Sequence, residues 1–119
     1  MAIFKKSTKK DFEDIEPKEA FTILEKHRND SDYVPLDVRT PKEYDDGHIE
    51  DATFLNIQSR DFEEELEKLD KDKKYFVYCR SGVRSNKAVN LMKKHGFNEI
   101  YNIIGGIEKW KSNRLPVEK

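Results

Sequence analysis

The sequence has a single cysteine, Cys79, and this scarcity limits the chemistry open to the chain. One cysteine among 119 residues excludes an intrachain disulfide and a cysteine-based metal cage. A lone cysteine fits a reducing compartment, of which the cytoplasm is the simplest expectation. Because the chain holds no second thiol, any disulfide or persulfide formed on Cys79 must be resolved by an outside acceptor.

Long apolar runs and a strong net charge are also missing. No stretch approaches the roughly 20 apolar residues of a membrane helix, and the basic segment 1–10 lacks the apolar region of a signal peptide. The formal net charge of −1 provides no overall field for nucleic acid or a membrane surface. We therefore expect neither partner. Segment 1–10 is expected to be a flexible basic tail, residues 11–119 a single domain, and the protein a monomer.

The order of apolar and amphipathic segments predicts an α/β domain. The predicted strands span residues 33–38, 53–57, 75–78 and 100–104. The predicted helices begin at 17 and 41 and cover 60–69, 82–95 and 107–111. Such alternation is typical of βα units around a largely parallel sheet. Thr40, Pro41 and Glu43 form the pattern of a capping box, while Pro35 indicates a sheet edge, a late strand start or a bulge.

The segment around Cys79 carries the strongest indication of chemistry. It follows a predicted strand and precedes a helix, where open α/β sheets bind ligands. Small and polar residues around Gly82 let the loop turn successive N–H groups inward, as an anion nest. The helix N-terminus, Arg80 and Arg84 add positive charge, and residues 79–95 contain no acid. These features favour an exposed thiolate able to hold a persulfide, a thiosulfate or a phosphate.

A buried structural role is the ordinary alternative for a lone cysteine. The strand end, the glycine, the two arginines and the following helix together favour a nucleophile instead. No histidine pair has metal-ligand spacing, so no metal site is expected.

Four segments of the chain resemble the rhodanese family. The loop Cys79-Arg80-Ser81-Gly82-Val83-Arg84-Ser85 is similar to the active-site loop of single-domain rhodaneses. The N-terminal signature is resembled by Leu36-Asp37-Val38-Arg39, Glu43-Tyr44 and Gly47-His48-Ile49. The C-terminal signature is resembled by Gly96-Phe97 and residues 102–110. The resemblance spans about residues 33–116 and implies a rhodanese-like three-layer fold, with about five mostly parallel strands flanked by helices on both faces.

The resemblance also implies a sulfurtransferase that works through a persulfide on Cys79 by a ping-pong scheme. The donor would be a small sulfur-containing anion such as thiosulfate, and the acceptor cyanide, a small thiol or a thiol of a partner protein. Cys79 would be the catalytic nucleophile. Substrate contact is expected through the backbone N–H groups of Arg80, Ser81, Gly82, Val83, Arg84 and Ser85. No cofactor is implied.

Four residues outside the loop have more than one interpretation. Asp37 and Arg39 could organise the active-site face or form a structural ion pair, and we favour the latter. His48 could form a Cys–His dyad, but the resemblance favours a capping or packing role. Trp110 could be a substrate platform, although a core plug is the simpler expectation.

The sequence departs from the family pattern in three places, one of which is Pro35, just before Leu36-Asp37-Val38-Arg39. Asp51 stands where many members have glycine, and Asn56-Ile57 where they often have proline. We expect these departures to alter a turn and a strand locally and to leave the fold unchanged.

Two other functions compete with sulfur transfer. Tyrosine phosphatases place five residues between cysteine and arginine, whereas four separate Cys79 from Arg84, and Tyr78 replaces the histidine before the nucleophile. The shorter loop makes a smaller cradle, which argues against a phosphatase or an arsenate reductase. Rhodanese-like domains can also be non-catalytic sulfur carriers or regulatory binding modules, but the retained cysteine and basic loop argue against that role.

Overall fold

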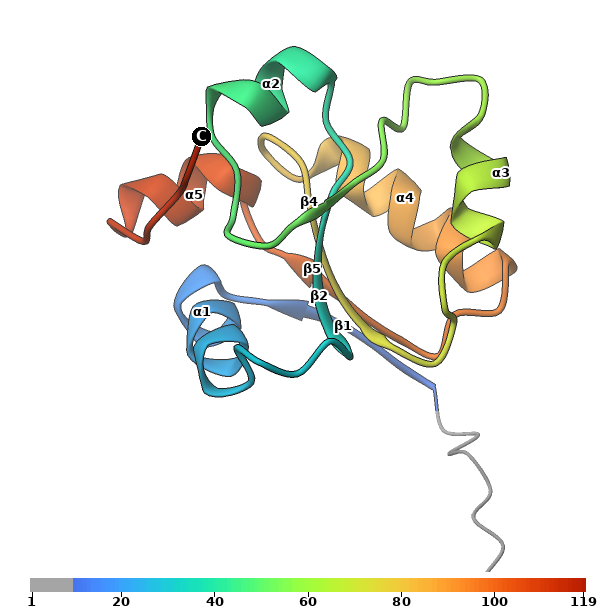
Figure 1. Ribbon diagram of the computed structural model, residues 1–119, viewed down its shortest axis with the longest axis horizontal. Helices are drawn as coiled ribbons and strands as arrows, with labels where there is room; N and C mark the ends of the chain where they lie inside the picture. The colour runs from blue at the N-terminus through green and yellow to red at the C-terminus, as the bar shows by residue number, and fades with distance from the viewer. Residues whose placement is uncertain (1–9) are drawn as a thin grey trace, which may run out of the picture.

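The centre of the fold is a five-stranded parallel sheet in the order β1-β5-β4-β2-β3 (Figure 1). The computed structural model describes residues 10–119. Its strands are β1 Asp11–Ile15, β2 Tyr33–Asp37, β3 Thr53–Phe54, β4 Lys74–Tyr78 and β5 Glu99–Ile103. All paired strands run in the same direction, so their carboxyl ends lie along one edge of the sheet. The predicted α/β architecture is confirmed.

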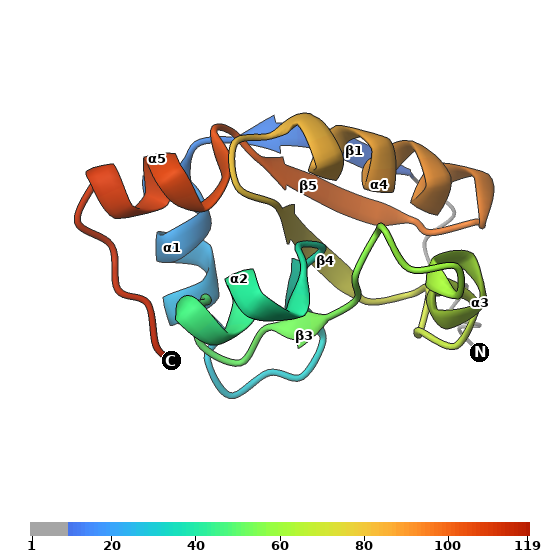
Figure 2. The same cartoon turned by 90° about the horizontal axis from the view of Figure 1, so that it is seen from above.

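Helices cover both faces of the sheet, as expected for three layers. They are α1 Pro17–Lys26, α2 Pro41–Asp46, α3 Phe62–Glu67, α4 Val83–Lys94 and α5 Gly106–Ser112. Figure 2 shows α1 and α5 on one side of the sheet and α3 and α4 on the other. Among residues 10–119, no helix combines the length and the apolar composition needed to cross a membrane.

Strand β4 divides the core, because its side chains alternate between the two faces. Tyr75 and Val77 pack in the cluster that receives α3 and α4, whereas Phe76 and Tyr78 pack in the cluster that receives α1 and α5. Cys79 follows directly and continues the alternation into the α3 and α4 side. Strands of a parallel sheet covered on both faces have nearly continuous apolar sequences, and segment 75–78 has such a sequence.

Trp110 is a core plug, as the simpler interpretation of the sequence predicted. The residue is 1% exposed, and Phe21 of α1 meets its ring edge-on at 5.8 Å between ring centroids. Its Nε1 donates a hydrogen bond of 2.8 Å to the carbonyl of Pro116. The indole thus fastens α5 to α1 and to the last segment of the chain.

Strand β1 was not foreseen as a strand. Its sequence holds three acids in five residues, but Phe12 and Ile15 pack on opposite faces of the sheet while the strand pairs with β5 at the edge. Of the expected flexible tail, residues 1–9 lie outside the described part of the chain. Lys10 is described, and its Nζ donates to Asn98 Oδ1 at 2.9 Å.

Pro35 does not make β2 an edge strand, because β2 lies between β4 and β3. The predicted strand 53–57 is shorter in the structure, where β3 pairs only with Leu36 and Asp37. The carbonyl of Asp37 accepts from Leu55 N at 2.9 Å, so Pro35, two residues earlier, also faces the β3 side. Since β3 pairs only with Leu36 and Asp37, no strand within residues 10–119 lies beside Pro35 on that side, and the missing N–H of proline costs no hydrogen bond of the sheet.

Asp51, at the position where the resembled family often has glycine, has a backbone conformation typical of glycine. Its φ is 63°, in the left-handed region that aspartate tolerates better than most residues. The departure therefore stays local, as expected.

Candidate active site

The sulfur of Cys79 lies at the carboxyl end of β4, inside a loop that turns back over it. Gly82 has a φ of 117°, a left-handed conformation that lets the chain reverse before α4 begins at Val83. The reversal brings Gly82 N within 3.0 Å of Cys79 Sγ. Ser85, in the first turn of α4, places its Oγ 3.6 Å from the same sulfur.

The pKa of the Cys79 thiol reflects two opposing causes. Burial raises the pKa, but hydrogen bonds from the Ser85 hydroxyl and from the backbone N–H groups of Ser85, Gly82 and Ser81 lower it more. The net pKa lies below that of an ordinary thiol, which increases the thiolate fraction near neutral pH. The inward turn of the loop is thus observed directly at Gly82, whose N–H donates to the sulfur. Contact between the loop and a substrate stays a prediction.

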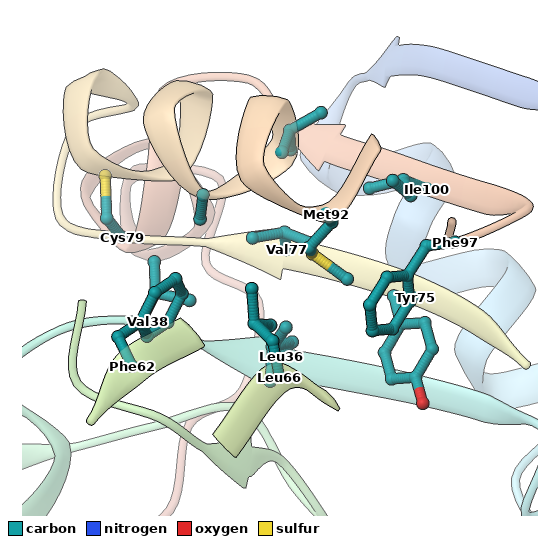
Figure 3. Close-up of a cluster of buried hydrophobic side chains, with 12 residues drawn as sticks. Leu36, Val38, Phe62, Leu66, Tyr75, Val77, Cys79, Met92, Phe97 and Ile100 are labelled. Atoms are coloured by element: carbon teal, nitrogen blue, oxygen red, sulfur yellow. The ribbon is translucent and has the colours of Figure 1, made fainter. Parts of the chain in front are cut away.

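The sequence led us to expect an exposed sulfur, and this was wrong. Cys79 is 1% exposed and belongs to the cluster that contains Val38 and Phe62. Figure 3 shows its side chain pointing away from these two apolar side chains and toward α4. The physical reason is the tight reversal at Gly82, which folds polar backbone over the sulfur. Cys79 is therefore buried under hydrogen-bond donors on its sulfur side and against apolar groups on its backbone side.

The hydroxyl of Ser85 can satisfy the sulfur in both protonation states. Ser85 is fully buried, and its Oγ donates to the carbonyl of Gly82 at 3.1 Å. A hydroxyl has one proton and two lone pairs. With a thiol, Cys79 S–H can donate to Ser85 Oγ while the hydroxyl donates to Gly82. With a thiolate, the hydroxyl can rotate and donate to the sulfur.

Backbone N–H groups in the first turn of α5 hold the carbonyl groups at the start of the cysteine loop. Ile107 N donates to the carbonyl of Cys79 at 2.9 Å, and Glu108 N donates to the carbonyl of Arg80 at 3.1 Å. A Cβ on Gly106 would lie 2.5 Å from both of these carbonyl oxygens. With its carbonyls held outward by α5, the loop can direct its N–H groups toward the sulfur.

Sequence reasoning treated Gly105-Gly106 as a turn and missed this anchoring role. The available signal was a pair of glycines directly after the last predicted strand, where a close approach of two backbones is one reason for glycine. The partner of that approach could not be read from the sequence.

Both arginines of the loop are paired with glutamates. The two Nη atoms of Arg84 donate to the two carboxylate oxygens of Glu43, each at 2.8 Å. Arg80 Nε donates to Glu108 Oε2 at 2.8 Å. The absence of acids from residues 79–95 suggested uncompensated positive charge, and the structure corrects this. The compensating acids come from α2 and α5, which are distant in the sequence.

Glu43 is held in place by its own helix as well as by Arg84. Thr40 N and Thr40 Oγ1 donate to Glu43 Oε1 at 3.1 and 3.0 Å, and Glu43 N donates to Thr40 Oγ1. The predicted capping box is confirmed. The hydrogen bonds from Arg84 are the main cause that lowers the pKa of Glu43 to about 2, so this carboxylate is ionised at neutral pH.

Asp37 and Arg39 form a buried ion pair beside the site. Arg39 Nε and Nη2 donate to the Asp37 carboxylate, the shortest of three contacts being 2.6 Å, and Nη2 also donates to the carbonyl of Gly47 at 2.7 Å. The two residues are 0% and 4% exposed. The pair ties the end of β2 to the turn after α2. Removing one partner of such a pair typically costs about 3–5 kcal/mol.

His48 lies in a packing position and not beside Cys79. Its ring stacks on Tyr44 at 3.8 Å between centroids, and Nδ1 is 2.9 Å from the carbonyl of Tyr44. Its backbone forms an antiparallel bridge with Glu118. These contacts leave no Cys–His dyad. Within residues 10–119, no group of three or more metal-ligating side chains is arranged to hold a metal ion.

Comparison with known proteins agrees with this geometry. The sequence model of the rhodanese-like domain family matches residues 20–113. The thiosulfate sulfurtransferase GlpE of Coxiella burnetii is 34% identical over 102 residues, which cover 86% of this chain and 90% of that protein. A rhodanese-related protein from Thermoplasma volcanium has a structure that superposes with a TM-score of 0.75 at 32% identity, covering 89% of this chain and 97% of that one.

The same domain also occurs within larger enzymes. A tRNA uridine(34) hydroxylase of Enterobacter sp. is 42% identical over 99 residues, which cover 75% of this chain but 28% of that protein. The match to the family spans nearly the whole described domain, includes the cysteine loop and agrees with the observed sheet. The chain is therefore a member of the rhodanese-like domain family, and its likeness to a thiosulfate sulfurtransferase supports a sulfurtransferase-like enzyme.

Proposed function

We propose that this protein carries sulfane sulfur as a persulfide on Cys79 and passes it from a donor such as thiosulfate to cyanide or a thiol. The observation that carries the proposal is the set of donors around one sulfur: three backbone N–H groups and one hydroxyl lower the pKa of Cys79. The same donors suit the terminal sulfur of a persulfide, which is also anionic. The likeness to GlpE supports this class of reaction.

Two displacements make up the proposed cycle. In the first, the Cys79 thiolate attacks the outer sulfur of thiosulfate. A bond forms between the two sulfurs, the S–S bond of the donor breaks, and sulfite leaves with its electron pair. In the second, cyanide or a thiolate attacks the outer sulfur of the persulfide, and Cys79 leaves as a thiolate. This is a ping-pong scheme with one covalent intermediate.

The cradle fits a sulfur atom better than a phosphoryl group. Gly82 N lies 3.0 Å from Cys79 Sγ itself, so this amide already contacts the nucleophile and leaves less room for three phosphoryl oxygens. The four residues between Cys79 and Arg84 form a shorter loop than that of tyrosine phosphatases, and Arg84 is engaged by Glu43. These features favour sulfur transfer over a phosphatase or arsenate reductase.

The proposal is tested by intact-protein mass spectrometry after incubation with thiosulfate or a small persulfide. We expect the wild type to gain one sulfur atom and the Cys79→Ser variant to gain none, since no other thiol can carry it. Adding cyanide should remove the sulfur and yield thiocyanate. Equal mass gain by both proteins would contradict the assignment of Cys79.

A second measurement separates the alternatives. Hydrolysis of an aryl phosphate should be absent from the wild type. Turnover that disappears in Cys79→Ser would instead establish a phosphatase. A wild type that neither gains sulfur nor hydrolyses phosphate would indicate a non-catalytic binding module.

A further inference from the structure

The charged side chains at the rim of the cysteine loop, Arg80 and Arg84 with Glu43 and Glu108, balance one another. The loop supplies two guanidinium groups, and each meets one carboxylate from another element, Glu43 of α2 or Glu108 of α5. The four side chains therefore contribute no net charge at neutral pH. Arginine recognises anions such as phosphate through hydrogen bonds from its guanidinium group, and both guanidinium groups of this loop are already hydrogen-bonded to glutamates.

The pair between Arg84 and Glu43 is partly buried and is held by several hydrogen bonds. Their side chains are 24% and 26% exposed, and the Glu43 carboxylate accepts four hydrogen bonds, two from Arg84 and two from Thr40. If Arg84 turned toward an incoming anion, it would leave the Glu43 carboxylate facing that anion. The pair between Arg80 and Glu108 is more exposed, at 67% and 54%, and so contributes less.

The donors that remain are suited to a single negative charge. Gly82 N lies 3.0 Å from the sulfur of Cys79, and hydrogen bonds from the N–H groups of Ser81 and of Ser85, which is in the first turn of α4, also lower the pKa of that sulfur. They can hold one anionic sulfur. Thiosulfate brings a second negative charge on its sulfonate group, for which the loop offers no arginine that is free of a glutamate. An organic persulfide, R–S–SH, brings the same reactive sulfur with at most one negative charge, and its protonated form brings none.

Resting on the proposed sulfur transfer, we propose that Glu43 is a specificity-determining residue that disfavours doubly charged donors and favours organic persulfides. In the favoured reaction, the Cys79 thiolate attacks the outer sulfur of R–S–SH. The new S–S bond forms on Cys79, the S–S bond of the donor breaks, and RS⁻ leaves with the electron pair. The proton stays on the transferred sulfur and is then lost to water.

The test measures the rate of sulfur loading on Cys79 with thiosulfate and with 2-hydroxyethyl persulfide, in single-turnover experiments. The Glu43→Gln variant removes one charge, and glutamine still completes a capping box. We expect the ratio of the thiosulfate rate to the persulfide rate to rise about tenfold, as expected for one charged contact. Glu108→Gln should raise the same ratio by about twofold, because that pair is exposed.

Glu50→Gln is the matched control. Glu50 forms a similar two-contact ion pair with Arg28, at 2.8 and 3.0 Å, and neither residue contacts the loop. The ratio should stay unchanged in this variant. A variant that merely loosened the fold would slow both donors together and would not move the ratio.

The salt dependence of sulfur loading tests the same charge balance on the wild type, without any variant. If the rim is electrically balanced, thiolate and thiosulfate repel each other. Salt would then raise the thiosulfate rate relative to the persulfide rate, because it screens charges. With free arginines, salt would lower it.

An unchanged donor ratio in Glu43→Gln, or a thiosulfate rate that falls with salt, would overturn the role of Glu43 while leaving the persulfide on Cys79 intact. If neither donor loads the wild type, the proposed function itself fails.

Discussion

At the scale of single residues, Cys79 shows how burial and nucleophilicity can coexist. Burial alone favours the neutral thiol, and Cys79 is among the least exposed residues of the described chain. The pKa is nevertheless lowered, because the loop supplies donors where water would otherwise stand. Ser85 is the one side chain among these donors, so its contribution can be removed without changing the backbone.

Replacing Ser85 with alanine should raise the pKa of Cys79 and slow its reaction below neutral pH. A hydrogen bond to a charged group contributes about 1.5–3 kcal/mol, so sulfur loading at pH 6 should slow by about tenfold, with a smaller loss at pH 9. The pH dependence of Cys79 alkylation and of loading measures the shift. Ser112→Ala, which removes an exposed hydroxyl from α5, is the control. An unchanged pH profile in Ser85→Ala would show that the backbone amides suffice.

At the scale of secondary-structure elements, the loop depends on the contact between α5 and β4. Two α5 amides hold the carbonyls of Cys79 and Arg80, and the backbone approach at Gly106 leaves no space for a side chain. The last helix of the chain thus shapes a loop that precedes it by more than twenty residues.

Gly106→Ala adds only one methyl group, but it should destabilise the fold and disturb the cysteine loop. The added Cβ would clash with two carbonyl oxygens at 2.5 Å, at a residue whose φ is 59°. We expect a loss of about 3 kcal/mol in the free energy of unfolding and strongly reduced sulfur loading. Denaturant unfolding and mass spectrometry measure the two effects.

Gly96→Ala provides the comparison for Gly106→Ala. Gly96 also has a positive φ, of 88°, but a Cβ there would meet only the Lys71 side chain at 3.9 Å. This variant should lose about 1 kcal/mol and keep its loading. If both variants retain loading, α5 does not shape the loop.

Most elements were predictable because local signals and burial agree. The capping box of Thr40 and Glu43 marked α2, and the apolar run 75–78 marked β4. By contrast, β1 was missed because its acids hide the alternation of Phe12 and Ile15. Strand β3 was predicted too long, because Leu55 and Ile57 pack against the core and donate single hydrogen bonds to the chain at Asp37 and Val38, but the paired register ends at Phe54.

At the scale of the whole molecule, the electrostatics of the site depend on contacts distant in sequence. Cys79 and its loop could be located from strand order and loop composition alone. The pairing of Arg84 with Glu43 joins residues 41 positions apart, and no local pattern predicts it. The same holds for the burial of the sulfur, which depends on how tightly the chain reverses at Gly82.

A second long-range cluster gives the domain a pH dependence. His95, at the end of α4, contacts Glu63 and Glu67 of α3, and Lys71 also pairs with Glu67. Hydrogen bonds from Glu63 and Glu67 are the main causes that raise the pKa of His95. A raised pKa in the folded state stabilises the fold below the unfolded value, and this contribution is lost as the pH rises through the folded value.

The link between α3 and α4 should therefore weaken as the pH rises above about 6.5, the ordinary pKa of histidine, through the raised pKa of His95. The wild type should lose a small part of its unfolding free energy over this range, while His95→Gln should show a flatter profile. Denaturant titrations at several pH values measure both slopes. Parallel profiles for the two proteins would show that His95 does not link the helices.

The single, covered thiol makes this molecule its own reporter of loop opening. A bulky maleimide dye can reach the sulfur only when the backbone above it moves aside, and no second thiol adds background labelling. The labelling rate therefore counts openings of one loop per molecule. The final stoichiometry gives the fraction of molecules whose sulfur was free to begin with.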